Sequence, residues 1–535
     1  MTPDQGEHWT QISPDLTRPD PGIPSNLDPP TAAHDEGLGP RRGVVYAIGP
    51  SPLEQGGLWA GTDDGLVWRS RDEGAHWTDV TPPALTPWSK VGIIEPSHFD
   101  PDTAYIAVDR HRLDDFAPYI YGTHDGGHTW TLLVSGISKT HAVNVVREDP
   151  VRRGLLYAGT ERGMYVSLDD GATWRSLQIN LPATSVRDID VKQNDLVIAT
   201  HGRAFWILDD VTPLRQLAAD FSLGATRLLA PAAAVRLRPE PFIGTPFPKD
   251  EPAAANPPFG ANLDYVLAAS ATEVTLTIRD AQQTVVRHYS SGDRARVLDP
   301  ARMNAAPEWT EAPVTLSTAP GLHRFVWPIR WTAPPALAAG NAFIDGVWAI
   351  PDRYTVELVV DGQRFTQPLD ILPDPRLNLP RAVYADAFAL ARRIEAARAQ
   401  VTASAATLGA LQRAITERLT SGDAMESSLL ASYLRELVGV TGVEPTVNPS
   451  NSSWRPAKAL TTLRYLNDTL SELATAVDGA DAAPSPDARA GVSKIEGLVP
   501  PVLAAAARIR ASSLDALNAR LTAAGRPRLE ISKVE

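Results

Sequence analysis

The 535-residue sequence contains no cysteine, so disulfide bridges and thiolate metal sites are excluded and cysteine usage leaves the redox compartment open. It also lacks any run of 18 apolar residues, so we expect no membrane-spanning helix. The opening residues, Met1 to Gly6, show no basic segment followed by an apolar one, and we therefore expect no signal peptide. Together these absences predict a soluble protein.

Positive charge is scarce as well. The 50 Lys and Arg residues are outnumbered by 63 Asp and Glu residues, and the net charge of −13 argues against nucleic acid or an anionic membrane as partner. No phosphate-binding glycine loop, Gly-x-Ser-x-Gly or His-Glu-x-x-His motif occurs, and we expect neither a cofactor nor a bound metal. The length predicts about two to four domains with sizeable cores.

A pattern of eight residues is repeated four times near the start of the chain. It consists of Ser or Thr, Asp two positions later, Gly two after that and Trp three beyond. Repeats at this spacing are typical of propellers and solenoids. The three fixed residues of the four copies are Asp4, Gly6 and Trp9; Asp72, Gly74 and Trp77; Asp125, Gly127 and Trp130; and Asp169, Gly171 and Trp174.

The chemistry of this octet is that of a hairpin turn. Its Asp and its Ser or Thr can accept hydrogen bonds from the backbone of the turn. Its Gly supplies the positive φ that a tight reversal needs, and its Trp opens the next strand and buries a large ring. We therefore assign the octet Asp residues a structural role rather than a catalytic one.

The flanking sequences complete a repeating unit. Leu58–Ser70 matches Leu156–Ser167: each contains a β-rich run, a reversal and a second β-rich run that leads into an octet. With a preceding strand candidate, at 44–48 and 142–146, and a last strand that starts at the Trp, each unit has four short strands. This is the antiparallel blade of a β-propeller, and about four blades are expected.

The first and last units are incomplete. Three strands are expected at 186–191, 195–200 and 204–208 with no octet after them, while a lone strand is expected around Trp9–Ile12. These remnants could pair to close a four-bladed propeller, or the blades could belong to a longer propeller, which we favour. An open arc would leave a sheet edge to be covered by a second chain or by self-association.

The rest of the chain changes character twice. After the blades at 1–211, a Pro- and Ala-rich connector is expected at 212–260, with Pro246, Pro248 and Pro252 blocking regular structure. Strand patterns at 261–373 predict an immunoglobulin- or fibronectin-like sandwich. Apolar stripes at 374–535 predict a helical bundle, with one helix of nearly forty residues from about Leu390, a second from Leu463 and a third after Pro500-Pro501.

On the octets, the chain resembles the Asp-box, or BNR-repeat, propeller proteins, which include sialidases, xyloglucanase-like glycoside hydrolases, a photosystem assembly-factor type and sortilin ectodomains. Residues 194–210, 256–261, 321–327 and 477–481 also look like the tail of large exported bacterial proteins labelled sortilin-like or BNR-repeat glycosyl hydrolases. The resemblance covers essentially the whole chain. It implies a propeller fold and export to the periplasm or the extracellular space, while its functional implication is weak.

Two segments hold the candidate functional residues. The loop at 109–115 combines an imidazole with three carboxylates, Asp109, Asp114 and Asp115, which are weak catalytic candidates because glycoside hydrolysis uses paired carboxylates. A solvated acidic loop is the simpler interpretation, and a calcium site is the third. The ligand-binding candidates are His111 of this loop and His201 and Arg203 of a later reversal.

These observations leave three functions open. We favour a non-catalytic recognition scaffold of the sortilin-like type that binds a peptide, protein or glycan through its blade loops. The alternatives are a xyloglucanase-like glycoside hydrolase and the C-terminal part of a split or truncated protein. A sialidase is disfavoured, because its set of three Arg, a Tyr nucleophile with a Glu partner and an acid Asp comes mostly from early blades that this chain lacks.

Overall fold

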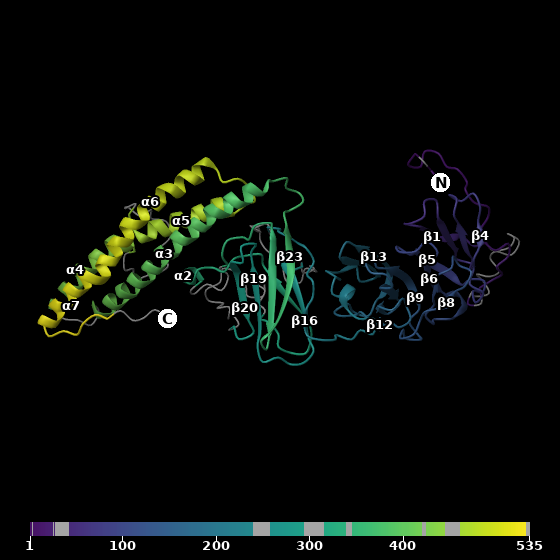
Figure 1. The fold of residues 1–535 in the computed structure, drawn as a ribbon, viewed down its shortest axis with the longest axis horizontal. Coiled ribbons are helices and arrows are strands. Elements are labelled where there is room, and N and C mark those ends of the chain that lie inside the picture. The colour runs from purple at the N-terminus through teal and green to yellow at the C-terminus, as the bar shows by residue number, and fades with distance from the viewer. Residues whose placement is uncertain are drawn as a thin grey trace. The chain divides into compact units, whose positions relative to one another are not determined.

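The computed structural model describes residues 1–2, 4–24, 26, 42–238, 257–293, 315–338, 345–419, 424–443 and 461–530 (Figure 1). They form two compact units, Met1–Ala225 and Thr226–Glu535, and each unit is described by itself. The fold is mainly β with a helical C-terminal region, as the sequence predicts.

The first unit is a series of antiparallel sheets in which consecutive strands are neighbours. Three of the sheets have four strands and the last has three. They are β1 (Val45–Pro50), β2 (Leu58–Thr62), β3 (Val67–Ser70) and β4 (Thr78–Asp79); β5 (Lys90–Pro96), β6 (Ala104–Asp109), β7 (Ile120–Thr123) and β8 (Thr131–Leu132); β9 (Val143–Glu148), β10 (Leu156–Thr160), β11 (Gly163–Ser167) and β12 (Arg175–Ser176); and β13 (Ser185–Lys192), β14 (Asp195–His201) and β15 (Phe205–Leu208).

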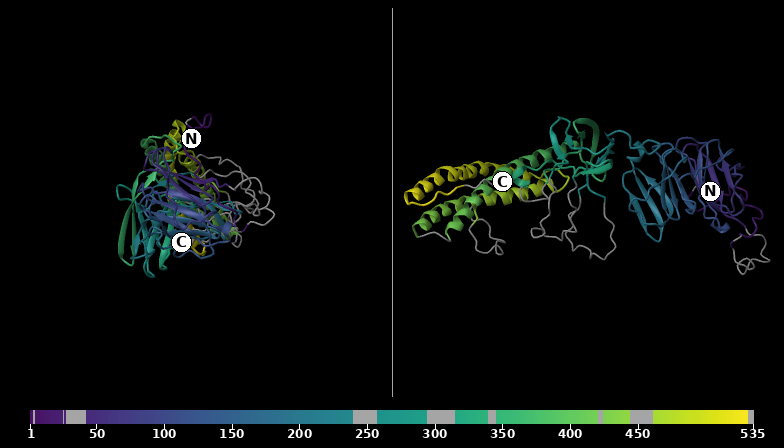
Figure 2. Two further views of the ribbon diagram at one scale, coloured as in Figure 1. Left: turned by 90° about the vertical axis from the view of Figure 1, so that its right-hand side faces the viewer. Right: turned by 90° about the horizontal axis from the view of Figure 1, so that it is seen from below.

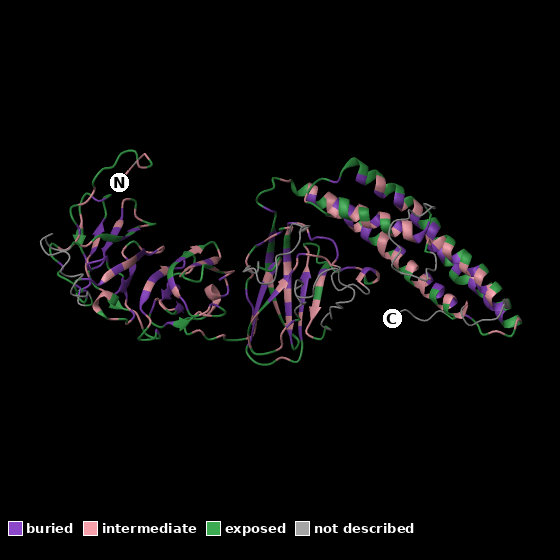
Figure 3. Cartoon of the chain, turned by 180° about the vertical axis from the view of Figure 1, so that it is seen from behind, coloured by how far each residue is buried: buried purple, intermediate pink, exposed green. Residues whose placement is uncertain are grey.

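Each sheet packs on the next through apolar side chains. Three buried clusters fill the three junctions, containing Val67 and Ile94, Ile120 and Val146, and Met164 and Ile189 respectively. Figure 3 shows buried residues in purple along the strands of the sheets. Burial of apolar area, at about 25 cal/mol per Å², is thus what holds the sheets in series.

The four octets adopt the same hydrogen-bonded turn. In every copy the Gly amide donates to the first Ser or Thr hydroxyl at 2.8–2.9 Å, and the Asp accepts from the backbone amide of the residue before the Trp at 2.8–2.9 Å. The other Asp oxygen binds the side chain of that same residue, a His or a Thr. The predicted turn chemistry is therefore present at all four positions.

The octet Trp residues join each sheet to the one before it. The indole N–H of Trp130 donates to the Val80 carbonyl at 2.8 Å, and that of Trp174 donates to Leu133 at 3.0 Å. Each acceptor lies three residues after the preceding octet Trp. Trp77 follows the same rule, because it donates to Ile12 at 3.0 Å, three residues after Trp9.

Residues 9–12 therefore occupy the place of a fourth strand, although the structure assigns no strand there. A strand was expected around Trp9–Ile12, but no described strand is paired with it, and a strand is defined by its ladder. Gly74 permits the close approach of residue 12, because a Cβ at this position, where φ is +93°, would lie only 2.7 Å from the Ile12 carbonyl oxygen.

In the second unit, two sheets share one apolar core. Their strand orders are β16-β18-β21 and β17-β23-β22-β19-β20. The bounds are β16 (Arg227–Leu228), β17 (Ala234–Val235), β18 (Ala261–Leu267), β19 (Val274–Arg279), β20 (Val285–Ser290), β21 (Gly321–Trp327), β22 (Arg353–Val360) and β23 (Gln363–Leu372).

The stretch predicted as a connector at 212–260 contributes to this core. It includes a 3₁₀ turn, Leu214–Gln216, and the short strands β16 and β17, which join one sheet each. Two-residue strands carry no periodicity, so the sequence gives no sign of them. Pro246, Pro248 and Pro252 lie outside the described residues.

The helices of the second unit run beside one another (Figure 2). They are α2 (Pro335–Ala338), α3 (Arg381–Leu419), α4 (Ala424–Thr441), α5 (Leu463–Asp478), α6 (Pro486–Arg508), a π-helical turn (Ile509–Ser513) and α7 (Leu514–Ala523). The predicted long helix and the helix from Leu463 are both present.

The third predicted helix starts earlier than expected. The prolines at 500 and 501 lie inside α6, which begins at Pro486 after Ser485 caps it by accepting from the Ala488 amide. Proline in a helix interior removes a backbone hydrogen bond. The stripe Val492, Ile495, Val499 and Val502 is buried on both sides of the prolines, so packing maintains the helix across them.

A buried ionic network joins the strands of the second unit to its helices. Arg236, which follows β17, donates to the Asp481 carboxylate at 2.7 Å, and Arg238 donates to the same oxygen at 2.5 Å. Both guanidinium groups lie near the ring of Trp348. Asp481 is 2% exposed, so this carboxylate is stable there only because two cations neutralise it.

We predict that Asp481→Ala destabilises the second unit by about 3–5 kcal/mol, because it removes the carboxylate bound by Arg236, whose side chain is 5% exposed, and leaves Arg238 with Asp478 alone. Urea unfolding followed by far-UV circular dichroism measures the change. Asp386→Ala is the control, since Asp386 and its partner Arg489 are both more than two-fifths exposed; that change should stay within about 0.5 kcal/mol. Equal effects of the two variants would contradict a central role for the network.

The octet turns predict a pH effect in the first unit. Hydrogen bonds from the Thr129 hydroxyl and amide lower the pKa of Asp125 from 3.8 to about 2. A carboxyl whose pKa is lower in the folded state stabilises the fold above pH 3.8 and loses that contribution as the pH falls toward 2.

Asp125→Asn should therefore lower the melting temperature at pH 7 and reduce the loss of stability between pH 4 and pH 2. Thermal melts across that range test it. Asp79→Asn, which alters a carboxylate outside the octets, is the control. An unchanged acid profile for Asp125→Asn would show that the octet carboxylate does not contribute to the fold.

Candidate functional site

The reversals that follow the second strand of each sheet lie at one end of the sheets. These strands, β2, β6, β10 and β14, occupy the same place in each meander, so the reversals after them share a side. The first residues of the four reversals are equivalent: Asp63, Asp109, Glu161 and His201. We call these reversals, with the bulged residues described below, the rim.

The largest reversal of the rim is the loop between β6 and β7. Asp109 is 7% exposed, and its carboxylate contacts the His111 ring nitrogen Nδ1 at 2.6 Å. Asp115 accepts from the Tyr119 hydroxyl at 2.7 Å and lies 3.5 Å from Arg110. Burial and the hydrogen bond to Asp115 raise the pKa of Tyr119. Both carboxylates therefore hold the loop in shape.

Asp114, the third acidic candidate, is exposed. It ends a single 3₁₀ turn, His111–Leu113, with a left-handed φ of 57°. The structure thus gives the three carboxylates different environments: Asp109 contacts His111, Asp115 contacts Arg110 and Tyr119, and Asp114 points from an exposed turn.

Arg112 connects the loop to the preceding sheet. It donates to Asp63 at 2.8 Å, and its guanidinium lies 5.5 Å from the centre of the Trp88 ring. Asp63 also accepts from the Val44 amide at 2.7 Å. The rim is in this way braced between the first and second sheets.

A β-bulge interrupts the first strand of each sheet next to the rim. The extra residues are Tyr46, Gly92, Asn144 and Arg187, which lie at equivalent positions in β1, β5, β9 and β13. Bulges redirect side chains and are frequent beside functional sites. The sequence analysis missed these residues, because a bulge has no composition signature; alignment of the four repeats would show the common position.

The bulged residues of the third and fourth sheets form a small polar cluster. Asn144 donates to Glu161 at 3.1 Å, and Arg187 lies 3.1 Å from the same carboxylate oxygen. Arg187 also donates to the Asn144 side-chain oxygen at 3.3 Å. Glu161 is thus neutralised, while Arg187 itself remains exposed.

Exposed basic groups gather at the third and fourth reversals. Arg162 follows Glu161, and His201 and Arg203 lie on the turn between β14 and β15. This turn holds itself by a hydrogen bond of 2.6 Å from the Thr200 hydroxyl to the Ala204 carbonyl. With Arg187, these side chains form a group that we call the basic rim. His111, the other predicted ligand residue, lies apart on the β6–β7 loop.

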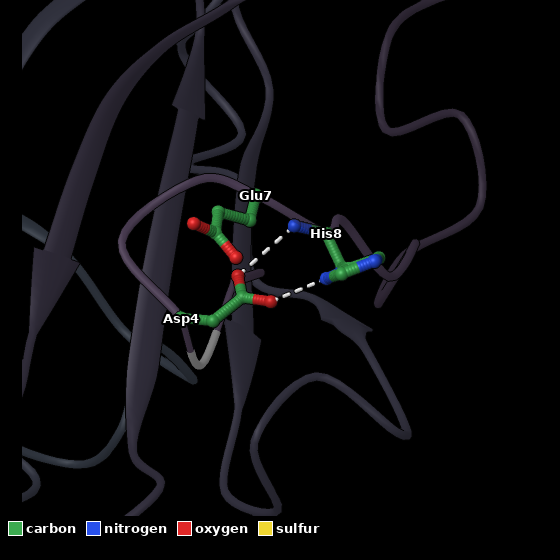
Figure 4. Close-up of side chains that lie close together, drawn as sticks. All are labelled: Asp4, Glu7 and His8. Atoms are coloured by element: carbon green, nitrogen blue, oxygen red, sulfur yellow. Dashed lines mark hydrogen bonds and ion pairs between the residues drawn. The ribbon is translucent and has the colours of Figure 1, made fainter.

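Among the described residues, one group has the spacing of a metal site: Asp4, Glu7 and His8, whose ligand atoms lie within 4.8 Å of one another (Figure 4). Asp4 and His8 belong to the first octet, and their contacts repeat those of Asp72 and His76. The backbone amide and ring of His8 and the Thr2 hydroxyl lower the pKa of Asp4 to about 2. The turn therefore accounts for this cluster without a metal.

A cavity of the second unit lies over β22 and β23. Its volume is 380 Å³, and its lining residues include Arg353, Gln367 and Tyr354 but no carboxylate or imidazole.

In the part of the chain that the structure describes, no helix is long and apolar enough to cross a bilayer.

Neither a protein-family model nor a curated protein matches the chain. Among solved structures, it is similar to YCF48 from Cyanidioschyzon merolae at 15% identity and a TM-score of 0.25, over 32% of this chain and 54% of that one. It is also similar to the Myceliophteria thermophila Cps50 (Swd1) β-propeller domain, at 10% identity and 0.27 over 33% and 56% of the two chains.

A third similar structure is an ancestral GH74 enzyme, at 14% identity and a TM-score of 0.23 over 46% of this chain and 32% of that enzyme. The region matched to YCF48 thus spans about half of the YCF48 chain and about a third of the present chain.

We predict that Arg112→Ala destabilises the first unit by about 1 kcal/mol, because Asp63, itself 7% exposed, keeps only a backbone donor. Urea unfolding measures the change. Arg153→Ala is the matched control: its partner Asp100 is 3.4 Å away and both side chains are a third or more exposed, so the loss should be within about 0.5 kcal/mol. Equal values would mean that Arg112 does not brace the rim.

Proposed function

We propose that this protein is a non-catalytic recognition scaffold of the sortilin-like BNR-repeat type, which binds a peptide or protein segment rich in carboxylates at the basic rim. The scaffold would consist of Asp-box propeller blades at 1–211, the connector at 212–260, an immunoglobulin- or fibronectin-like sandwich at 261–373 and a helical bundle at 374–535.

Support for propeller blades comes from the repeated unit. Four sheets follow one another with the same strand order, three of them have the octet turn between their third and fourth strands, and each packs on the next. Antiparallel meanders repeated in this manner are the blades of propellers.

The observation that carries the ligand proposal is the unequal pairing of charges at the rim. Three acidic groups are paired: Asp63 with Arg112, Glu161 with Arg187, and Asp115 with Arg110 and the Tyr119 hydroxyl, while Asp114 is exposed. Arg162 and Arg203, by contrast, are exposed on neighbouring sheets. The net charge of −13 opposes the approach of an acidic ligand, so the proposal depends on direct contacts at these two residues. Arg binds carboxylates in a fixed, often bidentate, geometry.

The same pairing argues against the glycoside hydrolase alternative. That reaction needs one carboxylic acid and one carboxylate facing a shared substrate site. Here Asp109 and Asp115 each serve the loop that carries them, and Asp114 stands on an exposed turn. We further propose that the protein acts outside the cytoplasm, as the family resemblance implies, with the sandwich and bundle as spacer or docking elements.

Binding of a fluorescent peptide of alternating Glu and Ser, followed by anisotropy, tests the proposal. The wild-type protein should bind it and should bind the matching Gln–Ser peptide far more weakly. Arg162→Ala and Arg203→Ala should each lower the affinity about tenfold, since a hydrogen bond to a charged group is worth about 1.5–3 kcal/mol.

Arg153→Ala is the control, because Arg153 lies in the β9–β10 reversal at the opposite end of the sheets; it should leave binding unchanged. Equal losses for all three variants would mean that only net charge matters and would contradict a specific site. In parallel, release of reducing ends from polysaccharides that is abolished by Asp114→Ala or Asp115→Ala would replace the proposal by the hydrolase.

A further inference from the structure

The outer face of the first sheet exposes a position that is buried in every other sheet. In each sheet, one residue from each of the first three strands pairs with the next to form a row across the sheet, and the member on the third strand is aromatic. The first members of this row are Ile48, Ile94, Val146 and Ile189. Ile94, Val146 and Ile189 are at most 3% exposed, whereas Ile48 is 68% exposed.

The outer face of the last sheet shows the same discrepancy. In a second row, a small residue on the second strand pairs with a large one on the third. The large residues are Val67, Ile120, Met164 and Phe205. The first three are 0% exposed, whereas Phe205 is 76% exposed, and its neighbour Ile207 is 59% exposed.

These two rows are the partners of each other at every junction. Val67 of the first sheet shares a cluster with Ile94 of the second, Ile120 of the second with Val146 of the third, and Met164 of the third with Ile189 of the fourth. At each of the three junctions, the face equivalent to that of Phe205 packs against the face of the next sheet that is equivalent to that of Ile48.

The strands at the two ends of the first unit are also complementary. The last sheet ends at β15 and has no fourth strand among the described residues, while residues 9–12 lie in the place of a fourth strand and pair with no described sheet. The unpaired backbone groups of an edge strand are a template for pairing with a strand of another chain.

We infer that two copies of this chain join head to tail, so that the Phe205 face of each copy packs on the Ile48 face of the other. Residues 9–12 of each copy then add the fourth strand beside β15 of its partner. With the four described sheets of the first unit of each copy, the two copies close a ring of eight, the upper end of the usual propeller range of about four to eight. The two contacts are identical and related by a two-fold axis.

A second copy is the occupant favoured by the structure, because this chain itself carries both halves of the contact. Closure within one copy would bury Ile48 and Phe205 together, yet both are more than two-thirds exposed. The inference concerns the ends of the first unit and does not depend on the ligand of the rim.

Light scattering of the purified full chain tests the assembly. We expect a mass of twice 57.6 kDa. Ile48→Asp and Phe205→Asp should each give monomers, since a charge would be buried at both contacts. Val151→Asp, at an apolar residue that is 63% exposed in the β9–β10 reversal, should remain a dimer. Circular dichroism confirms that each variant is folded.

Cysteine cross-linking distinguishes the head-to-tail contact from other dimers, and the absence of native cysteine keeps the result clean. With a short bis-maleimide, a mixture of Ile48→Cys and Phe205→Cys copies should give a covalent dimer, and neither variant alone should do so. Cross-linking of a single variant with itself would overturn the arrangement. So would a monomeric wild-type chain, a mass other than two copies, or a dimer insensitive to either Asp variant; a monomer would leave another protein's sheet as the occupant.

Discussion

The hydrogen bond that Trp77, Trp130 and Trp174 each donate to the preceding repeat sets the register in which apolar burial packs the sheets, and the first unit depends on that register. The acceptor of this hydrogen bond is a carbonyl that always lies three residues after the previous octet Trp, so the repeat in the sequence becomes a repeat in space. The octet turn fixes the position of the indole, and the apolar junctions fix the packing of each sheet on the next. The rim loops can consequently vary in sequence while the strands that carry them keep their places.

Much of this fold could be predicted because its signals are local. The octet turns follow from Asp, Gly and Trp at fixed spacing, and the long helix Arg381–Leu419 follows from its apolar stripe. Other features have non-local causes. Helix α6 passes through Pro500 and Pro501 because its stripe is buried on both sides, and β16 and β17 exist only because larger sheets offer them an edge. A stripe at Leu430, Tyr433 and Leu437 could have revealed α4, which was not predicted.

The candidate site shows the same division. The sequence located the acidic loop and the reversal with His201 and Arg203, both of which lie on the rim. It could not show that Asp109 and Asp115 are engaged within their own loop, because those contacts depend on Tyr119 and His111 being folded back on them. Nor could it find Tyr46, Asn144 and Arg187, whose importance comes from a bulge. Charge pairing, rather than the presence of acids, is what supports the proposed binding function over hydrolysis.

On the proposed assembly, the two ends of the first unit are sheet-packing faces that require a partner. Hydrogen exchange of the backbone amides, followed as a function of protein concentration, measures this most directly. The account predicts that protection of β15 and of residues 9–12 increases with concentration, while exchange in β6 and β10 stays the same. Exchange at β15 that is independent of concentration, with the chain folded, would contradict it.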